Sequence, residues 1–308
     1  MREPPRGLVD GEVLMIVRRH WSVEVDAVEH LPVGFGAHHW RASLRGEPRL
    51  FVTLDALGAR HSAASLEAAY AAAAALDLDI VVASWPTHTG AYTVPLELGR
   101  LSCAPWTTGK VAGSGPVADE RLARANIDAL ARLHAMTPPA GIPHWRPRVG
   151  PNFAGSLLGA LRGSWATGHY GEPARKAISL RIAAITDWTA RYHELAAQAA
   201  AVRWVPTHGE PHTRNQMITA AGLRFVDWES FALAPRERDL GPLIDAGYGD
   251  HLRPGWAMVE MYDLEWRLDE IAQYASWFSR RHSGSRDDQV AWEGLQRELA
   301  RPEWHSPP

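Results

Sequence analysis

Cysteine and lysine are scarce in this chain of 308 residues. A single cysteine, Cys103, excludes an internal disulfide and a metal cluster built on several thiolates, and suits a reducing compartment. Lysine occurs only at Lys110 and Lys176, and the formal net charge is −3, so the sequence offers no basic field for a phosphate backbone. We therefore expect no nucleic-acid partner and a cytoplasmic location.

Long apolar runs are also missing. The alanine-rich stretch 68–76 comes nearest to a membrane span and falls far short of the roughly 18 apolar residues that a span needs. The N-terminal segment lacks the apolar core of a signal peptide, so no membrane partner is expected. Apolar residues make up 46% and charged residues 22%, which is typical of soluble globular proteins.

The first hundred residues read as a small antiparallel sheet with inserted helices. Alternating apolar residues separated by short polar turns predict the strands. The expected helices are 8–20 and 65–78, and the expected strands are 23–33, 38–44, 49–54, 79–87 and 91–98.

The later part of the chain is mainly helical. Apolar residues recur along one face in three segments, 118–136, 173–201 and 254–282, and predict three helices. A loop rich in small residues, 103–116, separates them from the sheet, and the Gly-, Pro- and Trp-rich segment 138–172 is expected to be loop. We predict an α+β fold with two lobes and a ligand cleft between them: residues 1–102, a linker at 103–108, and residues 109–308.

Two neighbouring segments, 205–218 and 224–230, carry residues suited to phosphoryl transfer. This chemistry needs a carboxylate that accepts the proton of an attacking hydroxyl and oxygen ligands for Mg²⁺. Glu210 offers a loop carboxylate, and Asn215 offers an amide oxygen where a short strand begins. A turn at 219–222 makes the two strands a hairpin, which brings Asn215 and Asp227 to the same end. We expect the three side chains to converge.

The motifs HGEPHTRN (208–215) and VDWE (226–229) resemble the catalytic loop and metal motif of aminoglycoside phosphotransferases and choline-kinase-like enzymes. PRERDL (235–240) is similar to that family's Pro-x-x-x-Asp-Leu stretch, whose Asp is mainly structural. The resemblance implies the bilobal protein-kinase-like fold, with a small antiparallel-sheet N-terminal lobe and a larger helical C-terminal lobe. It further implies ATP or GTP as phosphate donor and Mg²⁺ as cofactor.

The resemblance also implies roles for single residues. Glu210 becomes the catalytic base and His208 the support of its loop, while Asn215 and Asp227 become the Mg²⁺ ligands. The remaining implied site residues contact nucleotide or substrate. Those for the nucleotide are Gly34 and Gly36 in a glycine turn, Thr53 on a strand, and Cys103, Pro105 and Trp106 in the linker; those for the substrate are Trp228, Glu229 and Asp263.

Three departures from the family's pattern stand out. Glu210 occupies a position where the family usually has Asp, which lengthens the side chain by one methylene. Thr53 lies where the family normally has a lysine that contacts the nucleotide phosphates. The turn containing Gly34 and Gly36 is only a fragment of a glycine-rich phosphate loop, and a simple hairpin turn explains it equally well.

Three functions remain open at this stage. The first is a kinase for a small-molecule alcohol, with a cationic antibiotic favoured because acidic residues such as Asp263 and Asp269 crowd the last quarter of the chain. The second is a kinase for a metabolite such as an amino alcohol or a sugar. The third is a nucleotide-binding pseudokinase, suggested by Thr53 and Glu210. A monomer and a homodimer are both compatible with the sequence.

Overall fold

The computed structural model describes residues 1–302 except four positions, which are 22, 59, 116 and 118. The chain divides into two compact units: unit 1 comprises 1–145 and 204–253, and unit 2 comprises 146–203 and 254–308. The start of the helix expected at residue 118 lies outside the described residues. The division into lobes around 103–108 stays a prediction.

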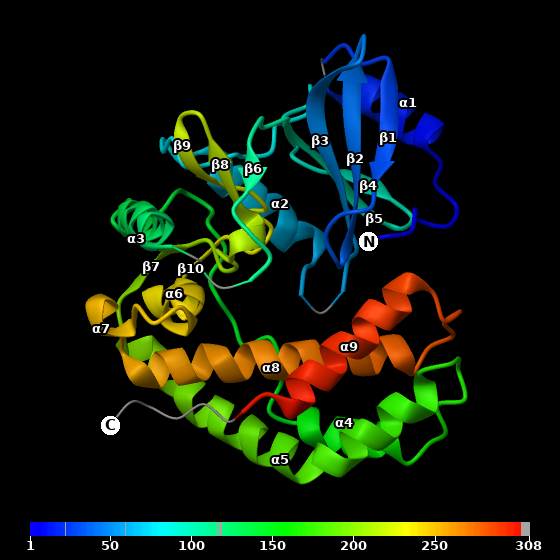
Figure 1. Ribbon diagram of the computed structural model, residues 1–308, viewed down its shortest axis with the longest axis vertical. Helices are drawn as coiled ribbons and strands as arrows, with labels where there is room; N and C mark the ends of the chain where they lie inside the picture. The colour runs from blue at the N-terminus through cyan, green and yellow to red at the C-terminus, as the bar shows by residue number, and fades with distance from the viewer. Residues whose placement is uncertain (22, 59, 116, 118, 303–308) are drawn as a thin grey trace. The chain divides into compact units, whose positions relative to one another are not determined.

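A five-stranded antiparallel sheet with the order β1-β2-β3-β5-β4 forms the N-terminal part of unit 1 (Figure 1). Its strands and its covering helix are α1 (Asp10–His20), β1 (Ala27–Leu31), β2 (Ala37–Leu44), β3 (Glu47–Asp55), β4 (Val94–Leu96) and β5 (Gly99–Pro105). Trp40, Val52 and Cys103 lie opposite one another on β2, β3 and β5 and pack with α1 in one apolar core. Because side chains alternate between the two faces of a sheet, His39, Thr53 and Ser102 form a polar row on the other face.

The segment 79–87 is not the expected strand, and the prediction that it pairs with a strand at 91–98 is wrong. The segment begins with a turn and an isolated bridge at Val81, and its backbone hydrogen bonds go to other parts of the chain: Val82 N–H donates to Phe225 O, and Trp85 N–H donates to Cys103 O. The hairpin instead joins β4 to β5, with Leu96 opposite Gly99. Only glycine fits there, because a Cβ on Gly99 would lie 2.0 Å from the Asp55 carbonyl oxygen.

The remainder of unit 1 combines two helices with two small sheets, β6-β8-β9 and β7-β10. An apolar core that includes Tyr70, Leu130, Phe225 and Trp228 holds these elements together. Asp119 begins α3 by accepting the Leu122 N–H at 2.7 Å. The elements are α2 (Ala63–Ala74), β6 (Lys110–Val111), α3 (Glu120–His134), β7 (Trp204–Thr207), η2 (Thr213–Asn215), β8 (Gln216–Thr219), β9 (Gly222–Phe225), β10 (Ala232–Pro235), η3 (Arg236–Asp239), α6 (Gly241–Asp245) and α7 (Gly249–Leu252).

Unit 2 is helical. Its two long helices, α5 and α8, lie side by side, and α9 packs against α8 (Figure 1). The helices are α4 (Phe153–Leu161), α5 (Gly171–Gln198), η1 (Ala199–Ala201), α8 (Trp256–Phe278) and α9 (Arg286–Ala300). The loop expected at 138–172 is therefore wrong over α4, whose leucines and alanines bury one side despite two glycines. No helix of the described residues is long and apolar enough to cross a membrane.

Candidate active site

The loop after β7 carries the candidate base, and Asp239 holds that loop in place. The Asp239 side chain is fully buried and accepts the backbone N–H groups of His208 at 2.9 Å and of Gly209 at 2.7 Å. His134 of α3 contacts the same carboxylate at 2.9 Å. Burial alone would raise the pKa of Asp239, but the hydrogen bond and charge of His134, together with the other contacts, lower it below its ordinary value. The structural role implied for this Asp agrees with these contacts.

His208 links the loop to the strand that precedes Asp227. Its Nε2–H donates to the Val226 carbonyl at 3.0 Å, which leaves Nδ1 to accept the Glu210 N–H at 3.3 Å. Burial lowers the pKa of His208 to about 4, so the ring is neutral at pH 7 and this tautomer is fixed. The geometry gives His208 a supporting role.

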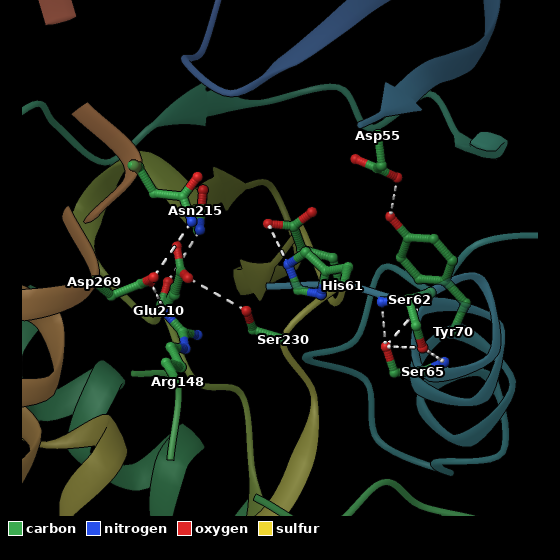
Figure 2. A network of polar contacts seen from close by, with 12 residues as sticks. Asp55, His61, Ser62, Ser65, Tyr70, Arg148, Glu210, Asn215, Ser230 and Asp269 are labelled. Atoms are coloured by element: carbon green, nitrogen blue, oxygen red, sulfur yellow. Dashed lines mark hydrogen bonds and ion pairs between the residues drawn. The ribbon is translucent and has the colours of Figure 1, made fainter. Parts of the chain in front are cut away.

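Glu210, Asn215 and Asp227 come together in unit 1, as the hairpin predicted. Asn215 Nδ2 donates to the Glu210 carbonyl at 3.0 Å, and Val226 N–H donates to the Asn215 carbonyl at 3.0 Å. Figure 2 shows Asn215 beside Glu210, with Ser230 donating to the Glu210 carboxylate. Burial raises the pKa of Asp227 well above its ordinary value, and the neighbouring carboxylates of Glu229, Glu210 and Asp55 raise it further.

These contacts fit a bound divalent cation. Because Asn215 uses its Nδ2 group toward Glu210, the atom of this side chain that could serve as a metal ligand is its oxygen. A cation would also offset the repulsion among the carboxylates that raises the Asp227 pKa. No group of three or more His, Cys, Asp or Glu side chains suited to a metal ion occurs in the described part of the chain. Asp227 would offer such a cation a carboxylate and Asn215 an amide oxygen, which are the kinds of ligand that Mg²⁺ prefers.

Asp55 extends this acidic cluster and was missed by the sequence reading. It ends β3 on the same face as Thr53, and Tyr70 of α2 donates to its Oδ2 at 2.8 Å (Figure 2). Burial raises the pKa of Asp55, and Glu229 raises it further. His61 Nε2 lies 3.5 Å from Glu229 Oε1. No local motif marks Asp55, because strand pairing and the position of α2 bring it to the cluster.

Thr53 bonds to a histidine. His39 Nδ1 and Thr53 Oγ1 are 3.2 Å apart, and burial lowers the pKa of His39 to about 3, so the imidazole is uncharged. Gly34 and Gly36 lie in the β1–β2 turn with φ of +71° and +95°. A Cβ on Gly34 would lie 2.9 Å from His39 Nε2, so this glycine allows the turn to lie directly on the imidazole. The nucleotide roles of these residues stay predictions.

The three linker residues fall at the end of β5. Burial raises the pKa of the Cys103 thiol, whose side chain packs in the core against α1. Its carbonyl is taken by Trp85 N–H at 2.7 Å, and Trp106 N–H donates to Arg49 O at 3.0 Å. The Pro105 carbonyl accepts a long 3.4 Å bond from Thr107 Oγ1. The Trp106 ring lies 6.3 Å from Phe51, on the face of Thr53.

Of the predicted substrate residues, Glu229 joins the acidic cluster, and the others lie elsewhere. Trp228 is 1% exposed, donates its Nε1–H to Phe225 O at 3.0 Å and packs 4.6 Å from the His208 ring. The structure thus gives Trp228 a packing role, and its ring surface is already covered. Asp263 lies on α8 of unit 2, where it pairs with Arg301 at 2.8 Å. A substrate role for Asp263 stays a prediction.

Two further residues at the site, Ser230 and Arg238, gave no signal in the sequence. Ser230 Oγ donates to Glu210 Oε1 at 3.2 Å, and the Arg238 guanidinium packs against Gly209, whose φ is +95°. A serine after VDWE and an arginine inside PRERDL are ordinary residues, so only their contacts reveal them.

Comparisons with known proteins bear on the family and the fold. Residues 28–277 match the model of the phosphotransferase enzyme family. Protein StrN of Streptomyces griseus is 32% identical over 190 residues, a match that spans 57% of this chain and 58% of that protein. The chain thus spans about 58% of the length of this curated relative.

Two solved structures have a similar fold. The structure of a spectinomycin phosphotransferase, in complex with ADP and spectinomycin, gives a TM-score of 0.71 at 13% identity and covers 97% of this chain and 96% of that chain. A microcompartment-associated aminopropanol kinase gives a TM-score of 0.60 at 15% identity, covering 94% and 96%. These likenesses confirm the α+β, protein-kinase-like fold, and the family match, which spans most of the sequence, confirms the resemblance: the chain belongs to the phosphotransferase enzyme family.

Proposed function

We propose that this protein transfers the terminal phosphate of ATP or GTP to a hydroxyl group of a small molecule. The observation that carries the proposal is the convergence of Glu210, Asn215 and Asp227 on a loop that Asp239 and His208 hold in place. A buried acidic cluster of this kind is costly for folding alone, which favours a role in binding or chemistry.

Glu210 accepts the proton of the attacking hydroxyl. As the hydroxyl oxygen bonds to the terminal phosphorus, the bond from that phosphorus to the bridging oxygen breaks, and the nucleoside diphosphate leaves. Asn215 and Asp227 would hold Mg²⁺, which when bound supplies positive charge to the phosphates. We place the adenine or guanine at the linker 103–108, where the Pro105 carbonyl, which makes only a long 3.4 Å contact with Thr107 Oγ1, could accept a hydrogen bond.

For the acceptor, we propose an antibiotic of the aminoglycoside, aminocyclitol or basic peptide type, so that the activity confers resistance. A structural neighbour that binds spectinomycin supports this class. The second candidate is a metabolite kinase acting on an amino alcohol, and a neighbour named as an aminopropanol kinase supports it.

Incubation of the protein with nucleotide, Mg²⁺ and a pool of antibiotics, amino alcohols and sugars tests the proposal. Mass spectrometry should find one compound heavier by one phosphate. Glu210→Gln should lower kcat by about 10²- to 10⁴-fold, the usual contribution of a general base, with nucleotide affinity retained. Glu97→Gln, on the exposed turn between β4 and β5, is the matched control and should leave kcat unchanged. Full activity of Glu210→Gln would remove its role as base. Magnesium-dependent nucleotide binding without transfer to any compound would favour the pseudokinase.

A further inference from the structure

Ser230 touches the candidate base directly. It follows the VDWE motif by one residue, and its side chain is buried, with Oγ donating to Glu210 Oε1 at 3.2 Å (Figure 2). This bond occupies one carboxylate oxygen of Glu210.

The backbone of Ser230 is fixed as well. Its carbonyl accepts an N–H of Arg238 at 2.8 Å, and the same Arg238 nitrogen donates to Thr207 Oγ1 at 3.1 Å. The Arg238 guanidinium also packs under Gly209, since a Cβ on that glycine would lie 2.6 Å from its Cζ. A single side chain therefore contacts the backbone just before Glu210 and the residue that bonds to the Glu210 carboxylate.

Glu210 needs such a support more than a shorter acid does. Glutamate has one more rotatable bond than aspartate, so its carboxylate can occupy more positions, and reacting groups lose about 10²-fold in rate when misplaced by about 1 Å. We propose that Ser230 is a positioning residue for Glu210: its hydroxyl holds Oε1 and so fixes the orientation of the carboxylate toward the attacking hydroxyl. This inference rests on the proposed function, and it links the Glu at position 210 to the serine at position 230.

The first test compares Ser230→Ala with Ser230→Thr in the transfer assay. The alanine variant should lower kcat by roughly tenfold while the KM for nucleotide stays within about twofold of wild type, since the hydroxyl acts on the base and not on the nucleotide. The threonine variant keeps the hydroxyl and should restore most of the activity. Ser43→Ala, which removes the hydroxyl of an equally buried serine on β2, should change neither parameter. A Ser230→Ala variant with kcat within twofold of wild type, or a threonine variant as slow as alanine, would overturn the inference.

The second test is a double-mutant cycle with Glu210→Asp. The shorter side chain cannot reach Ser230 Oγ, so adding Ser230→Ala to Glu210→Asp should not lower kcat any further. If Ser230→Ala lowers kcat by the same factor with Glu and with Asp at position 210, the serine does not act through Glu210.

Crystal structures of wild type and Ser230→Ala give a readout that does not need turnover. The Glu210 carboxylate should have one conformation in wild type and several in the variant. If wild type transfers phosphate to no acceptor and yet Glu210 loses its order in Ser230→Ala, the proposed function fails and the positioning role stands. An identical single conformation in both proteins would overturn the positioning role whatever the activity.

Discussion

Asp239 is expected to be the carboxylate on which the conformation of the loop after β7 depends most strongly. It accepts two backbone N–H bonds, from His208 at 2.9 Å and from Gly209 at 2.7 Å, in a fully buried position. A hydrogen bond to a charged group contributes about 1.5–3 kcal/mol, so Asp239→Ala should lower the free energy of unfolding by about 3–6 kcal/mol. Asp239→Asn keeps one acceptor oxygen and should lose about half as much.

Urea unfolding followed by circular dichroism measures both variants. Asp128→Asn, an exposed acid on α3, serves as control and should stay within about 0.5 kcal/mol of wild type. The pKa of folded Asp239 lies below its unfolded value, so its contribution is complete above about pH 4 and disappears as pH falls through the lower, folded pKa. The difference in the free energy of unfolding between wild type and Asp239→Asn should therefore become smaller toward low pH. A loss below about 1 kcal/mol for Asp239→Ala at pH 7 would refute the reasoning.

Two other predictions follow from the site. Gly34→Ala should lower the free energy of unfolding more than Gly36→Ala does. Both glycines have positive φ, but only a Cβ at Gly34 would meet the His39 ring, at 2.9 Å from Nε2. Equal free energies of unfolding for the two variants would contradict that packing. The ring resonances of His208, assigned by NMR through a His208→Gln variant, should not shift between pH 8 and about pH 5.5, because burial lowers its pKa to about 4 from an ordinary value near 6.5; a midpoint near 6.5 would show that the ring is not held neutral.

Periodicity located the regular elements where their contacts are local. The helices expected at 8–20, 173–201 and 254–282 correspond to α1, α5 with η1, and α8. Periodicity failed at 79–87. This apolar run predicts a strand, but its backbone N–H groups donate to the carbonyls of Phe225 and Cys103 in other segments. It also failed over Phe153–Leu161, because glycines that usually indicate loop are accommodated in a helix packed on α5. In both cases packing or hydrogen bonding with another element decided the local structure.

At the site, the sequence by itself determined which residues close together in the chain would meet. Glu210 and Asn215 are five residues apart, and one hairpin carries Asn215 and Asp227 together, so local geometry was enough to predict their convergence. Only the tertiary structure decided what surrounds them. Asp55, Ser230 and Arg238 reach the loop through strand pairing, burial and side-chain hydrogen bonds, and Trp228 turns into the core. Local spacing limits which chemical groups can meet, but the charge and order of those groups depend on neighbours that packing alone selects.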